Sequence, residues 1–238
     1  MPEIEAPQLS VVMPVYNEKD SIGDAVKEIQ AIVLDKVPGA ELVVVNDGST
    51  DSTKDVLEEL ARQDPRVRVI TQPNGGHGAA LRNGIELAQG QYMLLVDSDR
   101  QIAIEAFTEL WPLAQTCDMV MGIRAVRHDP PTRIYLTKFV RQVIKLLFGV
   151  SIRDANVPFK ILKRSLWLDA RTCIPPGTLA PSLFLAIFAL YKKYRVELRP
   201  VPHRERQCGV SSIRHLKLFK FCAMAFGQLM RFRKDLVA

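Results

Sequence analysis

Asp97 and Asp99 are the residues of this sequence whose type and spacing best suit the binding of a cation. They follow five apolar or aromatic residues, 92–96, a run that predicts a buried strand. Carboxylates two residues apart at a strand end can both reach one hard cation, which prefers oxygen ligands, and Gln101 adds an amide oxygen. Acidic pairs in loops are also commonly solvated turns, so the neighbouring strand ends decide between the two interpretations.

The elements that must position these aspartates alternate along the first half of the chain. Strands are predicted at 9–14, 42–45, 67–70 and 92–96, with helical repeats of apolar residues between them. This alternation predicts an α/β fold with one Rossmann-like, mostly parallel central sheet and helices on both faces. Ligands of such sheets bind beyond the carboxyl ends of the strands. The four ends are all polar and predict one binding cleft: 15–18, 46–49, 72–76 and 97–99.

The second half of the chain is less regular, but it contains no linker that would separate two domains. Its predicted strands are 118–122, 157–162 and 196–201, and its predicted helices are 134–148, 179–194 and 213–233. We therefore expect one main domain, 1–212, and a C-terminal amphipathic basic helix, 213–238, that belongs to the same domain.

The composition is that of an ordinary folded protein, with 238 residues of which 47% are hydrophobic and 24% charged. The net charge of +6 is modest, but basic residues are dense after Arg124 and after His203, where an anionic substrate or membrane surface could act. The few aromatic residues form no ladder for stacking bases, so nucleic acid is not an expected partner.

The cysteines and the N-terminus favour a reduced, cytoplasmic protein. Four cysteines lack any paired spacing, and the first residues are acidic, without the pattern of a secretory signal. The longest apolar run, 183–191, is far shorter than the ~20 residues that cross a bilayer. The histidines have no metal-ligand spacing, so we interpret them as structural or surface residues: His77, His128, His203 and His215.

An ordered set of motifs extends over most of the chain. The motifs are Val12-Met13-Pro14-Val15-Tyr16-Asn17-Glu18, Val45-Asn46-Asp47-Gly48-Ser49-Thr50-Asp51, Asn74-Gly75-Gly76-His77-Gly78-Ala79-Ala80, Asp97-Ser98-Asp99-Arg100-Gln101, Asp154-Ala155-Asn156-Val157-Pro158-Phe159-Lys160 and Arg206-Gln207-Cys208-Gly209-Val210-Ser211-Ser212. In this order and spacing the sequence resembles the family 2 glycosyltransferases of the GT-A fold. The resemblance is greatest to their polyprenyl-phosphate branch, to which the dolichol-phosphate mannose synthases belong.

The resemblance implies roles for the strand-end residues. It assigns the nucleotide-sugar to Pro14, Tyr16, Glu18, Asp47, Gly75, Asp97 and Ser98. It assigns Mg²⁺ or Mn²⁺ to Asp97, Asp99 and Gln101, and catalysis to Asp99 and Asp154. A carboxylate pairs well with ribose hydroxyls, and tyrosine offers a flat apolar face. Two roles stay open for Asp47, nucleotide binding or turn capping, and two for Asp154, orienting the sugar or acceptor or capping a turn.

The acceptor decides whether a catalytic base is needed. A lipid phosphate is already an anion and needs cations to hold it, whereas a saccharide hydroxyl needs a carboxylate such as Asp154 to remove its proton. Arg124 corresponds to an arginine of the branch. Arg133 with Thr137, and Arg206 with Ser211, are pairs in which a guanidinium and a hydroxyl can meet one phosphate. The alternative for these arginines is ordinary surface charge.

Two stretches, 132–147 and 217–234, combine apolar stripes with basic residues, as an interfacial helix requires, although such stripes are also typical of a core. With the resemblance, they predict a metal-dependent, inverting glycosyltransferase of cell envelope glycan biosynthesis, its catalytic domain at 1–212. It would move a sugar from a GDP- or UDP-sugar to a polyprenyl phosphate at the cytoplasmic face of the membrane, docked directly or through a separate membrane protein. The alternatives are a family 2 transferase acting on a saccharide hydroxyl, and a non-catalytic nucleotide-sugar or membrane-binding module.

Overall fold

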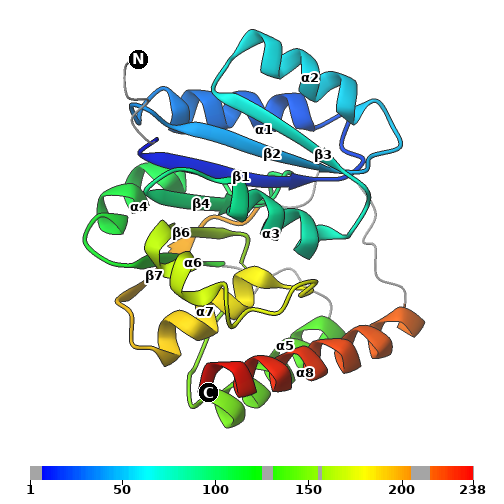
Figure 1. The fold of residues 1–238 in the computed structure, drawn as a ribbon, viewed down its shortest axis with the longest axis vertical. Coiled ribbons are helices and arrows are strands. Elements are labelled where there is room, and N and C mark those ends of the chain that lie inside the picture. The colour runs from blue at the N-terminus through cyan, green and yellow to red at the C-terminus, as the bar shows by residue number, and fades with distance from the viewer. Residues whose placement is uncertain (1–6, 125–130, 155–156, 205–214, 238) are drawn as a thin grey trace.

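A seven-stranded sheet forms the centre of the protein in the computed structural model, which describes residues 7–124, 131–154, 157–204 and 215–237, without the side chains of 131–136 and 215–223. The strands are β1 (Leu9–Val15), β2 (Glu41–Asp47), β3 (Val67–Gln72), β4 (Tyr92–Val96), β5 (Met119–Arg124), β6 (Phe159–Lys163) and β7 (Val196–Val201). Their order is β3-β2-β1-β4-β6-β5-β7 (Figure 1). Only β6 runs antiparallel to its neighbours among these strands. The expected mostly parallel α/β sheet is therefore confirmed.

Helices cover both faces of the sheet, also as expected. One face packs against α1 (Ile22–Ile29), its π-helical continuation η1 (Gln30–Leu34), α2 (Thr53–Gln63) and α4 (Ala106–Ala114). The other packs against α3 (His77–Leu87), α5 (Pro131–Phe148), α6 (Arg164–Ala170), α7 (Pro181–Tyr191) and α8 (His215–Val237). Side chains alternate along each strand, so Val11 and Met13 enter the first core while Val12 enters the second.

Three features of the fold were not predicted. Helix α4 contains Pro112, and α6 has seven residues, so neither shows a long, uninterrupted helical repeat. The antiparallel direction of β6 also escapes the sequence, because an apolar run has the same pattern in either direction. The structure thus inserts β6 between β4 and β5, two strands that point the same way.

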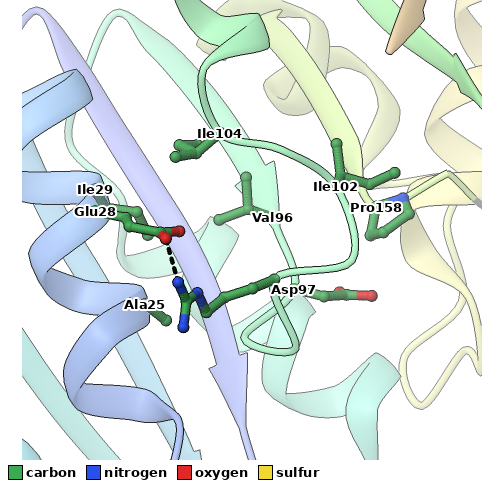
Figure 2. Close-up of a pocket in the computed structure, with 9 residues that line it drawn as sticks. Ala25, Glu28, Ile29, Val96, Asp97, Ile102, Ile104 and Pro158 are labelled. Atoms are coloured by element: carbon green, nitrogen blue, oxygen red, sulfur yellow. Dashed lines mark hydrogen bonds and ion pairs between the residues drawn. The ribbon is translucent and has the colours of Figure 1, made fainter. Parts of the chain in front are cut away.

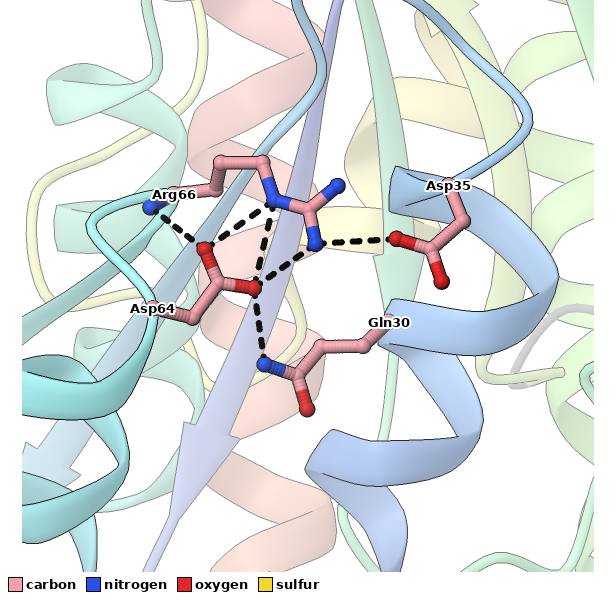
Figure 3. A network of polar contacts seen from close by, with 4 residues as sticks. All are labelled: Gln30, Asp35, Asp64 and Arg66. Carbon is pink, nitrogen blue, oxygen red and sulfur yellow. Dashed lines mark hydrogen bonds and ion pairs between the residues drawn. The ribbon is translucent and has the colours of Figure 1, made fainter.

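An ion-pair network joins the helical layer to the amino end of β3, far from the polar strand ends. Arg66 donates to both carboxylate oxygens of Asp64 and, at 2.9 Å, to Asp35, while Gln30 donates to Asp64 at 2.8 Å (Figure 3). The hydrogen bond from Arg66 is the main reason that the pKa of Asp64 falls to about 2. This network fixes the turn between α2 and β3 against η1.

Close packing of α3 on the sheet depends on Gly84. A Cβ at this position would lie 2.5 Å from Cγ1 of Val12 and 3.0 Å from Cγ2 of Val45. A glycine here lets α3 approach β1 and β2, which places the first turn of α3 beside the carboxyl ends of these strands. By contrast, a Cβ on Gly23 in α1 would meet nothing within 4 Å.

We expect Gly84→Ala to lower the free energy of unfolding by roughly 1–3 kcal/mol, because the added methyl group overpacks a filled core. The matched control Gly23→Ala should raise it by about 0.5–1 kcal/mol, since alanine loses less chain entropy in an open helical position. Chemical denaturation of both variants measures the difference. Equal effects of the two substitutions would contradict the close approach of α3.

Candidate functional site

The polar strand ends meet at one edge of the sheet. The parallel register pairs Val15 with Asn46 and Asp47 with Gln72, and it pairs Val12 of β1 with Leu95 of β4. The carboxyl ends of β1 to β4 therefore lie side by side, as the alternating pattern predicted. The end of β5 and the start of β6 reach the same edge, because β6 runs in the opposite direction.

Asp47 holds the glycine loop, residues 74–76, with a buried carboxylate that is 2% exposed. Its oxygens accept hydrogen bonds from the backbone N–H groups of Gly75 and Gly76, and from Nε2 of Gln72, all at 2.8 Å. Gly48 has φ +68°, and a Cβ there would lie 2.7 Å from the backbone nitrogen of Asn74. Asp47 therefore caps this loop in the structure, and its contact with a nucleotide stays a prediction.

The loops after β1 and β2 are interlocked. Asn17, at φ 53°, accepts a hydrogen bond from the N–H of Thr50 at 2.8 Å, and the N–H of Glu18 donates to Thr53 at 2.9 Å. The Glu18 carboxylate accepts from the hydroxyl of Ser21 at 2.6 Å. Tyr16 stays 47% exposed beside these contacts, as a base-stacking ring requires. Pro14, in contrast, is buried within β1.

The acidic loop, residues 97–101, carries the predicted cation ligands. Asp99 accepts a hydrogen bond from the N–H of Gln101 at 3.1 Å, and Ser98 is buried. Arg100 turns away from this edge toward α1, where it pairs with Glu28 and, at 3.2 Å, with Asp24. Figure 2 shows the small pocket behind the loop, which Glu28 and Asp97 help to line. The arginine thus anchors the acidic loop to α1.

His77 contacts the acidic loop, which the sequence did not predict. Its Nε2 lies 2.9 Å from Oδ1 of Asp97. Partial desolvation of the ring opposes its charge, but the hydrogen bond to Asp97 and the charges of Asp97, Asp99 and Asp47 outweigh it and raise the pKa of His77. No spacing rule reveals this contact, since His77 and Asp97 are 20 residues apart.

The donor atoms of the acidic loop fit a divalent cation that is shared with a ligand. Among the residues that the structure describes, no group of three or more His, Cys, Asp and Glu side chains could enclose a metal ion. Two carboxylates and an amide oxygen are nevertheless sufficient for Mg²⁺, which is usually held by one or two carboxylates together with substrate phosphates. The acidic loop therefore suits a cation that arrives with a diphosphate.

Arg124 and Asp154 form a buried ion pair at the other half of the edge. Nε and one terminal nitrogen of Arg124 each donate to a different oxygen of Asp154 at 2.8 Å, and the two side chains are 9% and 3% exposed. The structure therefore brings a predicted acceptor-phosphate ligand and a predicted catalytic carboxylate into direct contact. Such a two-pronged pair holds both groups in fixed orientations.

Lys160 is a buried cation in the same region, and the sequence assigned it no role. Its ammonium group is fully buried and donates to the carbonyl of Val157 at 2.6 Å and toward the hydroxyl of Ser182 at 3.4 Å. Burial lowers the pKa of Lys160 to about 8, although the charges of Asp154 and Asp97 oppose this shift. Its place in the motif 154–160 is the sequence signal that could have suggested a role for Lys160.

The remaining predicted acceptor residues are placed only in part. Thr137 lies half-buried in α5, and the backbone of Arg133 lies in the same helix. Arg206 and Ser211 lie outside the described residues, as does the side chain of Arg133. The grouping of Arg133, Thr137, Arg206 and Ser211 into one phosphate site therefore stays a prediction.

The sheet order, the two helical layers and the acidic loop define a glycosyltransferase-like protein of the GT-A fold. The chain belongs to Glycosyl transferase family 2, whose sequence pattern matches residues 10–181. This agrees with the resemblance that the motifs carried.

Relatives of known name support the same family. An undecaprenyl-phosphate 4-deoxy-4-formamido-L-arabinose transferase of Pseudomonas fluorescens is 30% identical over 88% of this chain. The same values hold for its namesake in Pseudomonas aeruginosa. The chain spans 61% of the length of either relative.

Solved structures share the fold at low sequence identity. Glucosyl-3-phosphoglycerate synthase from Mycobacterium tuberculosis, in complex with phosphoglyceric acid, superposes with a TM-score of 0.65 and 18% identity, over 97% of this chain and 80% of that one. A second structure of that enzyme, with Mn²⁺, UDP-glucose and phosphoglyceric acid, has the same TM-score at 17% identity and the same coverage.

We expect the buried Lys160 to give the protein a distinctive pH dependence. Between pH 8 and 10.5 the unfolded chain keeps a proton that the folded protein has released, so the stability of the wild type rises with pH relative to Lys160→Met. For one proton the slope of this difference reaches ~1.4 kcal/mol per pH unit. Urea denaturation of both proteins across this range measures it. Parallel stability curves would show an ordinary lysine pKa.

Proposed function

We propose that this protein transfers a sugar from a GDP- or UDP-sugar to a polyprenyl phosphate, with a divalent cation and with inversion at the sugar. The observation that carries the proposal is the assembly of the glycine loop and the acidic loop at one edge, in a chain 30% identical to undecaprenyl-phosphate sugar transferases over 88% of its length. Inversion is the outcome that the family resemblance implies.

On the donor side, each loop has a distinct task. The exposed ring of Tyr16 stacks on the base, and Asp47 keeps the glycine loop in place for close approach of the donor. Asp97, Asp99 and Gln101 would hold Mg²⁺ or Mn²⁺. When bound, the cation would supply positive charge to balance the negative charge that develops on the departing nucleoside diphosphate. The Mn²⁺ and UDP-glucose in the fold-related mycobacterial enzyme support this arrangement.

On the acceptor side, a phosphate fits the geometry better than a saccharide hydroxyl. A hydroxyl acceptor needs a free carboxylate as base, and Asp154 is buried and held by both prongs of Arg124. A phosphate oxygen is already a nucleophile and needs only positive charge to hold it. In our proposal the guanidinium groups of Arg124, Arg133 and Arg206 supply that charge, with Arg124 held in place by Asp154, and Thr137 and Ser211 add hydroxyl donors.

Helices α5 and α8 are the proposed contact with the membrane. They lie side by side at one end of the molecule (Figure 1). Phe148 of α5 packs on Phe232 of α8, with ring centroids 5.7 Å apart. Their inner residues belong to the core, but large apolar side chains are exposed on both helices: Phe139, Leu146, Met224, Phe226 and Met230. Within the described ranges, every helix is too short or too polar to pass through a bilayer.

Charge is concentrated in the same two helices. α5 contains four basic residues and no acidic one, and α8 contains five basic residues and Asp235, so together they carry a net charge of +8. The whole chain carries +6, which leaves a net charge of −2 for everything else. Exposed apolar side chains among cations fit the surface of an anionic lipid bilayer. We place this contact at the cytoplasmic face, in keeping with the unpaired Cys117 and Cys173.

Transfer of radiolabelled sugar from GDP- and UDP-sugars to a short polyprenyl phosphate tests the activity. We expect metal-dependent lipid product, abolished by a chelator and reduced roughly 100-fold or more by Asp99→Asn. Arg62→Ala, an exposed change on α2, serves as the control and should retain full activity. Product on saccharide acceptors alone would favour the hydroxyl alternative. Donor binding without any transfer would instead indicate a binding module.

Co-sedimentation with vesicles tests the membrane contact. We expect binding to anionic vesicles but not to phosphatidylcholine vesicles, and weaker binding as added salt screens the charges. Phe139→Glu combined with Leu146→Glu, at side chains 66% and 84% exposed, should weaken binding by at least about tenfold. Leu87→Glu, an exposed leucine on α3, is the matched control. Equal binding of all three proteins would exclude α5 as the contact surface.

A further inference from the structure

His77 lies between the two loops of the donor side. It is the first residue of α3, directly after the glycine loop, and its Nε2 lies 2.9 Å from Oδ1 of Asp97 in the acidic loop. The side chain is 57% exposed, so the ring lies at the open face of the edge. Among the contacts of the described residues, this one links a side chain of α3 to a predicted cation ligand.

The backbone that carries His77 is held on both sides. Before it, Gly75 and Gly76 donate their N–H groups to the buried carboxylate of Asp47. After it, Gly78 packs so closely on the next segment that a Cβ would lie 2.4 Å from the carbonyl oxygen of Thr178 and 2.6 Å from that of Leu179. The attachment point of the imidazole is therefore fixed, and the hydrogen bond to Asp97 limits the orientations open to the carboxylate.

Asp97 needs such a constraint. Two carboxylates two residues apart repel each other, and a repelled side chain turns toward solvent unless a partner holds it. Arg100, the nearest cation in sequence, is engaged with Glu28 and Asp24 on α1. A ligand carboxylate is usually oriented by an outer hydrogen bond, and loss of that bond typically weakens metal binding 10–100-fold.

We propose that His77 is a positioning residue that holds the Asp97 carboxylate in the orientation in which it binds the divalent cation. The inference rests on the proposed metal-dependent function. His77 does not ligate the cation itself; its Nε2–H donates to Asp97 and leaves the second carboxylate oxygen for the cation. His77, at the start of α3, thereby orients Asp97 in the acidic loop.

Binding of Mn²⁺ in the presence of saturating UDP or GDP tests this role without turnover. The electron paramagnetic resonance signal of free Mn²⁺ reports the bound fraction for the wild type, His77→Ala, His77→Gln and the control Arg62→Ala. We expect His77→Ala to weaken Mn²⁺ binding about 10–100-fold. His77→Gln should stay within about threefold of the wild type, because its amide N–H can replace the donor at the position of Nε2.

The affinity of each variant for the nucleotide in the absence of metal separates a positioning role of His77 from a direct contact with the nucleotide. We expect it to be unchanged in both His77 variants, with thermal unfolding as a check on the fold. Wild-type Mn²⁺ affinity in His77→Ala would overturn the inference and leave the proposed function intact. Unchanged Mn²⁺ affinity with weaker metal-free nucleotide binding would overturn it in favour of a direct phosphate contact. No Mn²⁺ binding by the wild type with either nucleotide would overturn the proposed function as well.

Discussion

The carboxylate of Asp47 ends β2 inside the protein, and the arrangement of the donor side depends on what it accepts. Two backbone N–H groups of the glycine loop and the amide of Gln72 surround it. The same Gln72 accepts a hydrogen bond from Asn83 in α3 at 2.8 Å, so the polar chain extends from the strand end into the helix. Burial of a charged carboxylate without hydrogen-bond donors costs free energy, so the glycine loop is held in the conformation that supplies these donors. This conformation sets the start of α3 and therefore the position of His77.

The first turn of α3, directly after the glycine loop, is in contact with the opposite half of the molecule. Gly78 packs on the carbonyl groups of Thr178 and Leu179, in the segment before α7. Gln228 of α8 holds this segment from the other side, accepting from the N–H of Leu179 at 3.0 Å and donating to the carbonyl of Gly177 at 3.1 Å. One short segment thus lies between the donor loops and the helix that we propose to contact the membrane. The proposed donor site and the proposed membrane-contact surface are therefore both in contact with the segment 177–179.

Three buried charges mark the junction between the donor and acceptor halves. Arg124 and Asp154 pair closely, and the fully buried Lys160 lies on the antiparallel strand β6. Burial of charges costs free energy, and a hydrophobic replacement often gives equal or greater stability. Their presence at the carboxyl edge is therefore better explained by a requirement of the site than by stability. In the proposed reaction these residues orient the acceptor phosphate. Asp154 holds the Arg124 side chain in place and does not remove a proton from an acceptor hydroxyl.

The sequence by itself determined which segments form the sheet and where its polar ends lie. Apolar runs and helical repeats are local properties, so all seven strands and the shared edge of 15–18, 46–49, 72–76 and 97–99 could be predicted from them. Only the tertiary structure decided the partners: His77 with Asp97, 20 residues apart, and Arg124 with Asp154, 30 residues apart. Such contacts depend on strand order and direction. The antiparallel insertion of β6 between β4 and β5 brings Asp154 and Lys160 to the edge, and it results from packing across the whole sheet, which no local pattern encodes.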